Sequence, residues 1–297
     1  MTIEDINDFL EYQLEVWPEA RKGFEALKHA ERKPLPLGDL DGAAQCNPAR
    51  IRSTAAKTDP ESIRKRACFL CADNRPPEQI ALPFLEGWEM LVNPYPILPV
   101  HFTIAATEHR PQGEMPLDMA AMAEKAPDLV FFYNGARAGA SAPDHQHCQA
   151  VLKSELPLVR LIEAAHTRQE ESVMTSPGLG LDLPFTTFSA IVPPGPEGMK
   201  VLLAMSRCHG TDKITGEEDA ALVNAFFWID SEGYLRILVI PRSAHRPDCF
   251  FKEGEEHFTV SPGAIDMAGL LILPDKNDFD RMTPEKAREI YAQTGIA

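Results

Sequence analysis

Residues 133–149 read YNGARAGASAPDHQHCQ, a glycine-containing turn followed by an alternating run that is typical of a β-strand. Side chains two residues apart lie on the same face of a strand. The alternation therefore predicts that His145, His147 and Gln149 share one face, with neighbouring residues roughly 6.6 Å apart. Two imidazoles and one amide would be presented together.

The turn before these side chains has the composition of an anion-binding loop. Gly135 and Gly139 let the backbone bend tightly and approach an anion closely. Asn134 and Ser141 add short hydrogen-bonding side chains. We interpret the segment as a phosphate cradle that leads into a pair of imidazoles.

An imidazole suits phosphoryl chemistry because its neutral nitrogen is nucleophilic near pH 7 without losing a proton. Attack on the α-phosphorus of a nucleotide gives a nucleotidyl-histidine, whose P–N bond breaks readily when an acceptor arrives. The alternative is a strand with two histidines that only pack beside a turn. The complete His-x-His-x-Gln pattern after Gly-x-x-x-Gly-x-Ser favours catalysis.

Cys68-Phe-Leu-Cys71 is the second motif, and its spacing lets two thiolates bind one zinc ion. His109 and His145 are the best candidates for the other two ligands. Zinc bound to His145 would hold the strand that carries His147. An unmetallated pair and a redox pair are the alternatives, and the absence of a surrounding βαβ pattern argues against redox work.

Apolar runs between turn residues predict an α+β fold. The expected strands cover residues 88–93, 101–106, 128–134, 145–152, 186–192, 199–205, 234–240 and 268–273. The expected helices cover 2–30, 115–126 and 155–172, a segment from a capping box at Thr215 and Glu218 through Phe227, and a C-terminal helix that begins at Thr283-Pro284. A loop is expected over 34–42.

One short pattern occurs twice. An apolar strand is followed by His109-Arg-Pro and, 136 positions later, another is followed by His245-Arg-Pro. A duplicated α+β unit and chance both explain the echo. Arg242, His245 and Arg246 gather after the second of these strands, where they could reach an acceptor anion or simply form a surface turn.

The charge balance restricts the partners. The 297 residues include 29 Lys and Arg against 44 Asp and Glu, a formal net charge of -15. Such a surface repels polyphosphate backbones, so we expect no nucleic acid partner, and a small anionic substrate needs a local basic cluster. No apolar run approaches the roughly 20 residues of a membrane span. An acidic N-terminal segment and six cysteines without a disulfide pattern favour the cytosol.

The motifs resemble those of the histidine-triad superfamily, in its transferase branch. Galactose-1-phosphate uridylyltransferases and diadenosine tetraphosphate phosphorylases end the active-site motif in Gln, as here at Gln149. The Ser-x-x-Asp-His-x-His-x-Gln form from Ser141 is similar to the phosphorylases, whereas Cys68-x-x-Cys71 resembles the uridylyltransferase zinc site. The segment from Asn93 to His101 resembles the strand and turn that hold the nucleoside, with Asn93 near base or ribose.

The resemblance implies a ping-pong nucleotidyltransferase. His147 would be the nucleophile and Gln149 would donate to a phosphoryl oxygen. Because Gln cannot shuttle a proton as His can, transfer is favoured over hydrolysis. A dinucleoside polyphosphate or an NDP-sugar would donate NMP to phosphate; transfer between sugar 1-phosphates and a non-catalytic nucleotide-binding module are the alternatives. Arg50, Arg52 and Lys57 would bind the outgoing or incoming phosphate, or are solvated surface charges.

The resemblance covers residues about 47 to 152 most clearly, and the whole chain resembles a bacterial family related to sugar-nucleotide phosphorylases. It implies two related halves, each an antiparallel sheet flanked by helices. We therefore expect an N-terminal helical segment over 1–45, a catalytic half over 46–172 and a second half over 173–297. A structural Zn²⁺, no membrane partner and a homodimer, common in this superfamily, complete the expectations.

Overall fold

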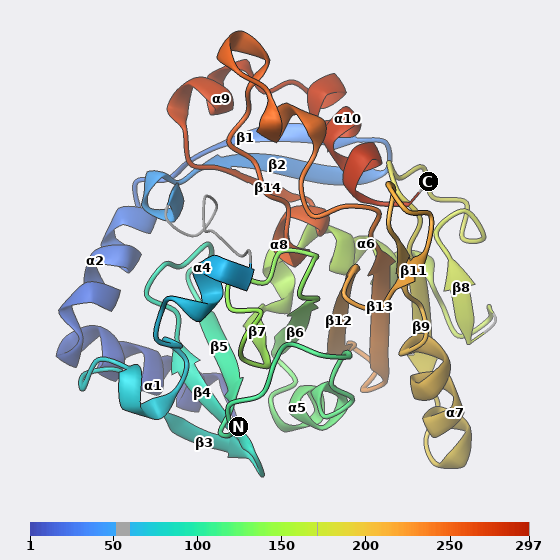
Figure 1. The fold of residues 1–297 in the computed structure, drawn as a ribbon. Coiled ribbons are helices and arrows are strands. Elements are labelled where there is room, and N and C mark those ends of the chain that lie inside the picture. The colour runs from blue at the N-terminus through green and yellow to red at the C-terminus, as the bar shows by residue number, and fades with distance from the viewer. Residues whose placement is uncertain (52–59, 171, 297) are drawn as a thin grey trace.

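The computed structural model describes residues 1–51, 60–170 and 172–296, and one large antiparallel sheet forms its centre (Figure 1). The sheet has nine strands and an α+β arrangement, as the sequence predicted. Their spatial order is β3 (Leu82–Leu85), β4 (Trp88–Val92), β5 (His101–Ala106), β7 (His147–Leu152), β6 (Leu129–Asn134), β12 (Val223–Ile229), β13 (Leu235–Pro241), β9 (Phe188–Val192) and β8 (Val173–Thr175).

The pairing of β6 with β12 joins the two parts of this sheet. Strands from residues 82–152 lie on one side of that pair and strands from residues 173–241 on the other, and Asn134 lies opposite Asn224 across it. The hairpins β4–β5 and β12–β13 are each followed by His-Arg-Pro. The repeated pattern therefore occupies equivalent places in two hairpins, and gene duplication stays a prediction.

A second, smaller sheet covers one face of the first. Strands β1 (Glu31–Leu37) and β2 (Leu40–Cys46) form an antiparallel hairpin, and β14 (Leu270–Leu273) pairs with β2 in parallel. The expected loop over 34–42 was therefore wrong. Leu35 and Leu37 alternate with exposed residues, while Gly38, at φ +68°, makes the two-residue turn.

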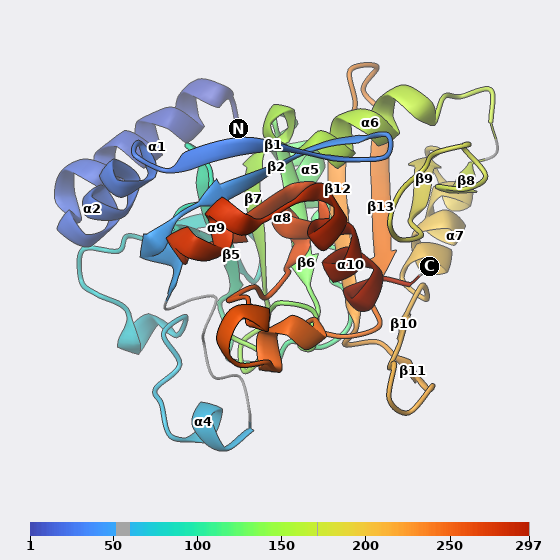
Figure 2. The same cartoon turned by 90° about the horizontal axis from the view of Figure 1, so that it is seen from above.

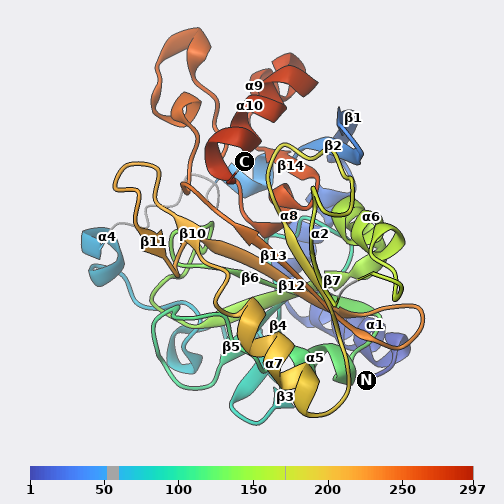
Figure 3. The ribbon, with the colours of Figure 1, turned by 90° about the vertical axis from the view of Figure 1, so that its right-hand side faces the viewer.

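Helices lie on both faces of the large sheet (Figures 2 and 3). One face carries α1 (Ile3–Val16), α2 (Pro18–Leu27), α5 (Met119–Lys125) and α7 (Pro196–Met205). The opposite face carries α6 (Pro157–Ala165), α8 (Ala264–Met267), α9 (Lys276–Arg281) and α10 (Pro284–Thr294). Short helical segments in the connections are η1 (Pro48–Arg50), α4 (Pro60–Arg64), η2 (Ala72–Asn74), η3 (Lys153–Glu155), η4 (Asp248–Phe251) and η5 (Gly254–Glu256).

Strand alternation divides the interior into two cores. Val130 and Phe132 of β6 pack toward the small sheet and α10, whereas Phe131 and Tyr133 pack toward α1 and α5. Both cores take residues from before and after position 173, so burial of apolar surface holds the two parts of the chain together. None of the helices in the described part of the chain is long and apolar enough to span a bilayer.

Two elements were predicted with the wrong type of secondary structure. Residues 199–205, expected as a strand, belong to α7, because Pro196 starts a helix that buries Leu202 and Met205. The helix expected from Thr215 through Phe227 is absent. There Asp212 caps a turn through the backbone N–H groups of residues 214 and 215, and the run VNAFFWI forms β12 between two strands. The helix at Thr283-Pro284 is confirmed.

Candidate active site

A cavity of about 780 Å³ lies over the face of the large sheet that carries His147 and Gln149. Strand register explains why these groups meet there. Gln149 lies opposite Thr103 on β5 and opposite Phe132 on β6, and all three side chains line the cavity. The opposite wall comes from the chain around α8, including Ser261. The cavity therefore needs both the N-terminal and the C-terminal parts of the chain.

His147 lies at the wall of this cavity with one ring nitrogen fixed. Its Nδ1 lies 2.8 Å from the carbonyl oxygen of His145. Because a carbonyl oxygen only accepts, Nδ1 carries the proton and Nε2 keeps its lone pair. Burial lowers the pKa of His147 to about 4, so the ring is neutral at pH 7. The result is a neutral imidazole with an available nucleophilic nitrogen.

Gln112 holds the backbone of His147, a role that the sequence analysis missed. Its Oε1 accepts from the N–H of His147 at 2.8 Å, and its Nε2 donates to the carbonyl oxygens of His147 and Asn134. This buried amide therefore bridges the start of β7 and the end of β6. Nothing in the segment around Arg-Pro-Gln112 distinguishes it in the sequence from an ordinary loop glutamine.

Gln149 is oriented by His101, which the sequence analysis also left without a role. The N–H of Ile97 donates to Nδ1 of His101 at 3.1 Å, so the proton of this imidazole lies on Nε2. That Nε2 donates to Oε1 of Gln149 at 2.8 Å. The amide oxygen of Gln149 is thereby occupied, which leaves its NH₂ group as the donor at the cavity. Burial lowers the pKa of His101 to about 3, which keeps this arrangement neutral.

The two glycines of the predicted phosphate cradle also pack closely against the C-terminal part of the chain. Gly139, at φ +102°, and Ser141 line the cavity, but an added Cβ on Gly139 would lie 2.6 Å from Cα of Gly263. Gly135 lies away from the cavity lining, where a Cβ would meet the carbonyl oxygen of Ala221 at 2.3 Å. Both glycines therefore allow close approach to the C-terminal part of the chain as well as a tight turn.

Asn134 links the cradle to the same C-terminal part. Its Oδ1 accepts from Nδ2 of Asn224 at 2.9 Å and from the N–H of Ala264 at 2.7 Å. Asn224 in turn accepts from the buried guanidinium of Arg242 at 2.5 Å. The network thus runs from Arg242, at the end of β13, through Asn224 on β12 to Asn134 at the cradle. Arg242 is therefore a buried structural residue and does not lie in a surface turn.

Of the three cations predicted to bind phosphate, Arg50 is the one that lies within the described residues. Its side chain lines the cavity, and Nη1 donates to the carbonyl oxygen of Tyr95 at 2.7 Å. Within the described part of the chain, its buried Nε has no hydrogen-bond partner. Burial lowers the pKa of Arg50 to about 10, so it remains a cation at pH 7. Arg52 and Lys57 lie outside the described residues.

A mixed aromatic and polar patch closes the end of the cavity near α2. Trp17, Asn93 and Tyr95 line it, and Oδ1 of Asn93 accepts from the N–H of Tyr95 at 3.0 Å. The Tyr95 hydroxyl donates to Glu19, which also lines the cavity. A flat apolar wall with carboxylate and amide groups suits a nucleobase. The sequence analysis named Asn93 here but missed Trp17 and Glu19.

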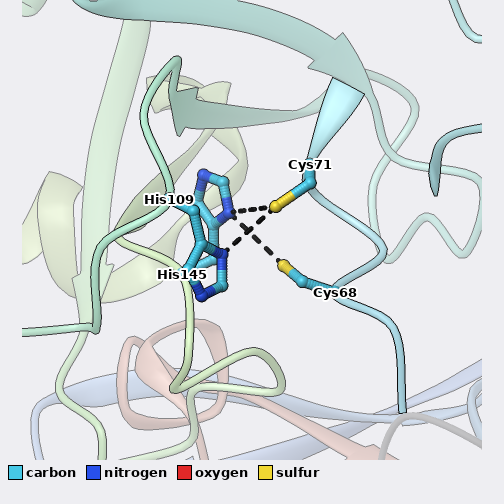
Figure 4. A group of neighbouring side chains, drawn as sticks. All are labelled: Cys68, Cys71, His109 and His145. Carbon is cyan, nitrogen blue, oxygen red and sulfur yellow. Dashed lines mark hydrogen bonds between the residues drawn. The ribbon is translucent and has the colours of Figure 1, made fainter. Parts of the chain in front are cut away.

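Cys68, Cys71, His109 and His145 come together near the start of β7 (Figure 4). Their ligand atoms all lie within 4.8 Å of one another. Cys68 Sγ lies 3.3 Å from Nδ1 of His145, and Cys71 Sγ lies 3.2 Å from Nδ1 of His109. In a tetrahedral zinc site, bond lengths of about 2.3 Å to sulfur and 2.0 Å to nitrogen place S and N about 3.5 Å apart. The observed spacing therefore fits a four-ligand metal site.

The environment of His145 prepares it for this role. Its Nε2 donates to the carbonyl oxygen of Ala106 at 2.8 Å, which leaves the Nδ1 lone pair facing the two sulfurs. The prediction that His145 shares a face with His147 and Gln149 was wrong in one respect. His145 precedes β7, in a turn, and its ring faces the cysteines rather than the cavity.

The fold, a continuous antiparallel sheet with His147 and Gln149 on a central strand and the Cys₂His₂ cluster beside it, matches that of solved structures. Yeast Ap4A phosphorylase Apa2 in complex with Ap4A matches with a TM-score of 0.58 and 17% identity, over 95% of this chain and 97% of that one. The same yeast enzyme in complex with AMP matches with a TM-score of 0.53 and 15% identity, over 95% and 96% of the two chains.

Sequence comparisons add little to this likeness. A family model described as a domain of unknown function (DUF4922) matches residues 9–152, which contain both motifs. No curated protein matches the sequence significantly. The chain thus shares the fold of Ap4A phosphorylase.

Proposed function

We propose that this protein is a nucleotidyltransferase of the phosphorylase type, which transfers NMP from a dinucleoside polyphosphate to inorganic phosphate. The observation that carries the proposal is the neutral His147 ring at the cavity wall, with Nδ1 bound to a carbonyl and Nε2 available. The structural neighbours are complexes of a phosphorylase with Ap4A and with AMP, which supports the same substrate class.

The residues define a two-step reaction. Nε2 of His147 attacks the α-phosphorus, the P–N bond forms, and the P–O bond to the leaving nucleotide breaks with its electron pair on the departing oxygen. The ring becomes cationic, and the His145 carbonyl that accepts from Nδ1 stabilises this charge. The NH₂ group of Gln149 donates to a phosphoryl oxygen. Phosphate then attacks the same phosphorus, the P–N bond breaks, and an NDP leaves.

The remaining site residues have supporting roles in this proposal. Asn134, Gly139 and Ser141 hold the phosphates of the donor, and Arg50 neutralises their charge. Asn93 contacts the nucleoside. Gly135 shapes the turn, and Arg52 and Lys57 stay predictions for phosphate binding.

We assign the Cys₂His₂ cluster to a structural zinc ion held by Cys68, Cys71, His109 and His145. Two thiolates and two neutral imidazoles are a donor set that zinc prefers. Burial raises the pKa of Cys68 to about 11, and a bound cation offsets that cost by stabilising the thiolate. The ion would fix His145, whose carbonyl oxygen accepts from His147.

The test is direct capture of the covalent intermediate. Protein is mixed briefly with Ap4A labelled at the α-phosphorus and quenched in base, because a phosphoramidate is stable in base and labile in acid. We expect label on His147, none on the His147→Ala variant, and equal amounts of ATP and ADP when phosphate is added. NDP-sugars in place of Ap4A test the sugar-nucleotide alternative. Tight binding of every donor without label would favour a non-catalytic binding module.

A further inference from the structure

Three polar side chains of the C-terminal part of the chain form a hydrogen-bonded cluster in the cavity. Nε of Arg246 donates to Oγ of Ser261 at 3.0 Å, and Nε2 of His245 lies 3.0 Å from the same oxygen. The guanidinium carbon of Arg246 lies 4.1 Å from the centre of the Phe250 ring. The serine hydroxyl thus fixes both neighbours, and the aromatic ring supports the guanidinium from one side.

The cluster lies in the same cavity as His147, next to the phosphate cradle. His245, Arg246 and Ser261 all line the cavity, as does His147. Gly139 of the cradle approaches Gly263 so closely that a Cβ would lie 2.6 Å from its Cα. Because two residues of chain span at most about 7 Å, Ser261 lies within one phosphate group's reach of the cradle backbone.

The charge of this region differs from that of the whole protein. The chain has a formal net charge of -15, yet the residues of the cavity lining that the structure describes include four cations and two acids. The cations are Arg50, Lys65, Arg66 and Arg246, and the acids are Glu19 and Asp266. Two of these cations already have carboxylate partners, since Lys65 pairs with Glu61 and Arg66 pairs with Asp144. Nε of Arg246 donates to the neutral hydroxyl of Ser261.

We propose that Arg246, Ser261 and His245 form the binding subsite for the phosphate next to the transferred NMP group. The subsite would hold the β-phosphate of the donor in the first step and inorganic phosphate in the second. One subsite serves both, because the leaving and attacking oxygens occupy the same side of the α-phosphorus in successive steps through a histidine intermediate. The inference rests on the proposed function and extends it to the acceptor.

The chemistry assigns each residue a distinct task. Arg246 pairs with the acceptor's oxygens, which brings a phosphate dianion next to an anionic nucleotidyl group despite their repulsion. Ser261 and His245 hold the guanidinium in place. In the transfer step a phosphate oxygen forms the new P–O bond, the P–N bond to His147 breaks, and Nε2 recovers its electron pair. No proton has to leave the ring, because Nδ1 stays protonated throughout.

The experiment separates attack by phosphate from attack by water. Wild-type protein and each variant are loaded with labelled Ap4A and freed of nucleotides by gel filtration. The loss of label from the protein is then followed in buffer with or without inorganic phosphate. For Arg246→Gln and Ser261→Ala we expect the rate constant for phosphate to fall roughly 10- to 100-fold, while hydrolysis by water is unchanged. Arg246→Lys should recover part of the loss. Arg288→Gln, at an arginine outside the cavity lining that pairs with Asp182, is the matched control.

A second measurement keeps the inference testable without turnover. Binding of inorganic phosphate in the presence of AMP is measured by calorimetry for wild-type protein and for Arg246→Gln. Weaker binding to the variant supports the subsite even if no labelled intermediate forms, an outcome that would overturn the proposed function alone. The subsite would be overturned if wild-type protein and Arg246→Gln bound phosphate equally, or if the wild-type protein bound none. An unchanged ratio of phosphorolysis to hydrolysis in the variants would also overturn it.

Discussion

The Nε2 atom of His101 lies 2.8 Å from Oε1 of Gln149, so the tautomer of one buried imidazole determines which end of the amide faces the cavity. We predict that His101→Leu lowers kcat for nucleotidyl transfer by about 10- to 100-fold with little change in KM. The amide would lose its orienting donor, and an amide that rotates freely presents its oxygen to the phosphoryl group part of the time. Steady-state kinetics with varied donor concentration measures both constants.

His166 provides the control for this variant. It is also buried, and its Nδ1 lies 2.8 Å from Oγ of Ser189, far along the sheet from Gln149. His166→Leu should reduce stability and leave kcat of the folded enzyme unchanged. Equal losses of kcat in the two variants would show that His101 acts only through general stability.

Arg242 should contribute strongly to stability. Its guanidinium is fully buried and donates to the carbonyl oxygen of Thr294 and to Oδ1 of Asn224. Arg242→Met would remove the donor to the buried Oδ1 of Asn224 and one of the two donors to the Thr294 carbonyl, which the N–H of Ser243 also contacts, at a cost of about 3 kcal/mol in the free energy of unfolding. Urea denaturation measures it. The exposed Arg288→Met should change stability by less than about 0.5 kcal/mol, and a similarly small effect at Arg242 would contradict the network.

The Cys₂His₂ cluster predicts a metal-dependent fold of the segment that precedes β3. Native protein should carry about one equivalent of zinc per chain by elemental analysis. Cys68→Ser combined with Cys71→Ser should abolish this content and lower Tm, because a metal that binds only the folded state stabilises it. Cys208→Ser, at a cysteine outside the cluster, should leave both unchanged. Equal zinc in both variants would remove the assignment.

Asp266 should make stability depend on pH in the opposite direction to an ordinary carboxylate. Burial raises its folded-state pKa from the ordinary value of 3.8 to about 6. Between these pH values the unfolded chain ionises first, so the contribution of Asp266 to stability is largest below pH 4 and is lost as the pH rises from about 4 to about 6. The stability difference between wild type and Asp266→Asn should therefore fall by about 2 kcal/mol from pH 4 to pH 7.

Denaturant titrations at several pH values between 4 and 7 measure this difference. Absolute stability is not the readout, because Asp266 also accepts from the N–H groups of Gly263 and Ile272, which Asn cannot fully replace. A difference that stays constant across the range would show that the carboxyl has an ordinary pKa.

Gly139 should tolerate no side chain. Gly139→Ala combines a φ of +102° with a Cβ placed 2.6 Å from Cα of Gly263. Gly233, at φ +86°, has nothing within 4 Å of the corresponding position. We expect Gly233→Ala to cost about 1 kcal/mol from backbone strain alone, and Gly139→Ala to cost at least twice as much and to slow transfer. Equal costs would mean that the cradle can move away from Gly263.

The sequence predicted which residue types gather at this site better than how they are held there. His147 and Gln149, which line the cavity, were named because of their short spacing, and Cys68, Cys71, His109 and His145, which lie together, were named because each residue type is chemically specific. His101 and Gln112 were missed because they act by orienting other groups, and such roles depend on contacts between strands far apart in sequence. Arg50 was found only as one of a basic cluster, since exposure cannot be read from a charge pattern.

The errors in secondary structure have a similar origin. The helix was predicted from a good capping signal at Thr215 through Phe227, yet β6 and β13 offer strand partners on both sides of residues 224–227, and that pairing outweighs a local preference. The hairpin of residues 31–46 contains two prolines, which the pattern treated as a loop. Both prolines lie on β1, an edge strand that can omit hydrogen bonds.

The pairing of β6 with β12 has a consequence for how the chain can be divided. A fragment that stopped at residue 152, where the family match ends, would contain the whole Cys₂His₂ cluster and His147. It would lack β12, so the backbone edge of β6 would have no strand partner, and Phe131 and Phe132 would lose part of the two cores that cover them. A bare central edge flanked by aromatic side chains readily recruits other copies. Such a fragment would aggregate during expression, and only a chain that includes β12 would cover this edge.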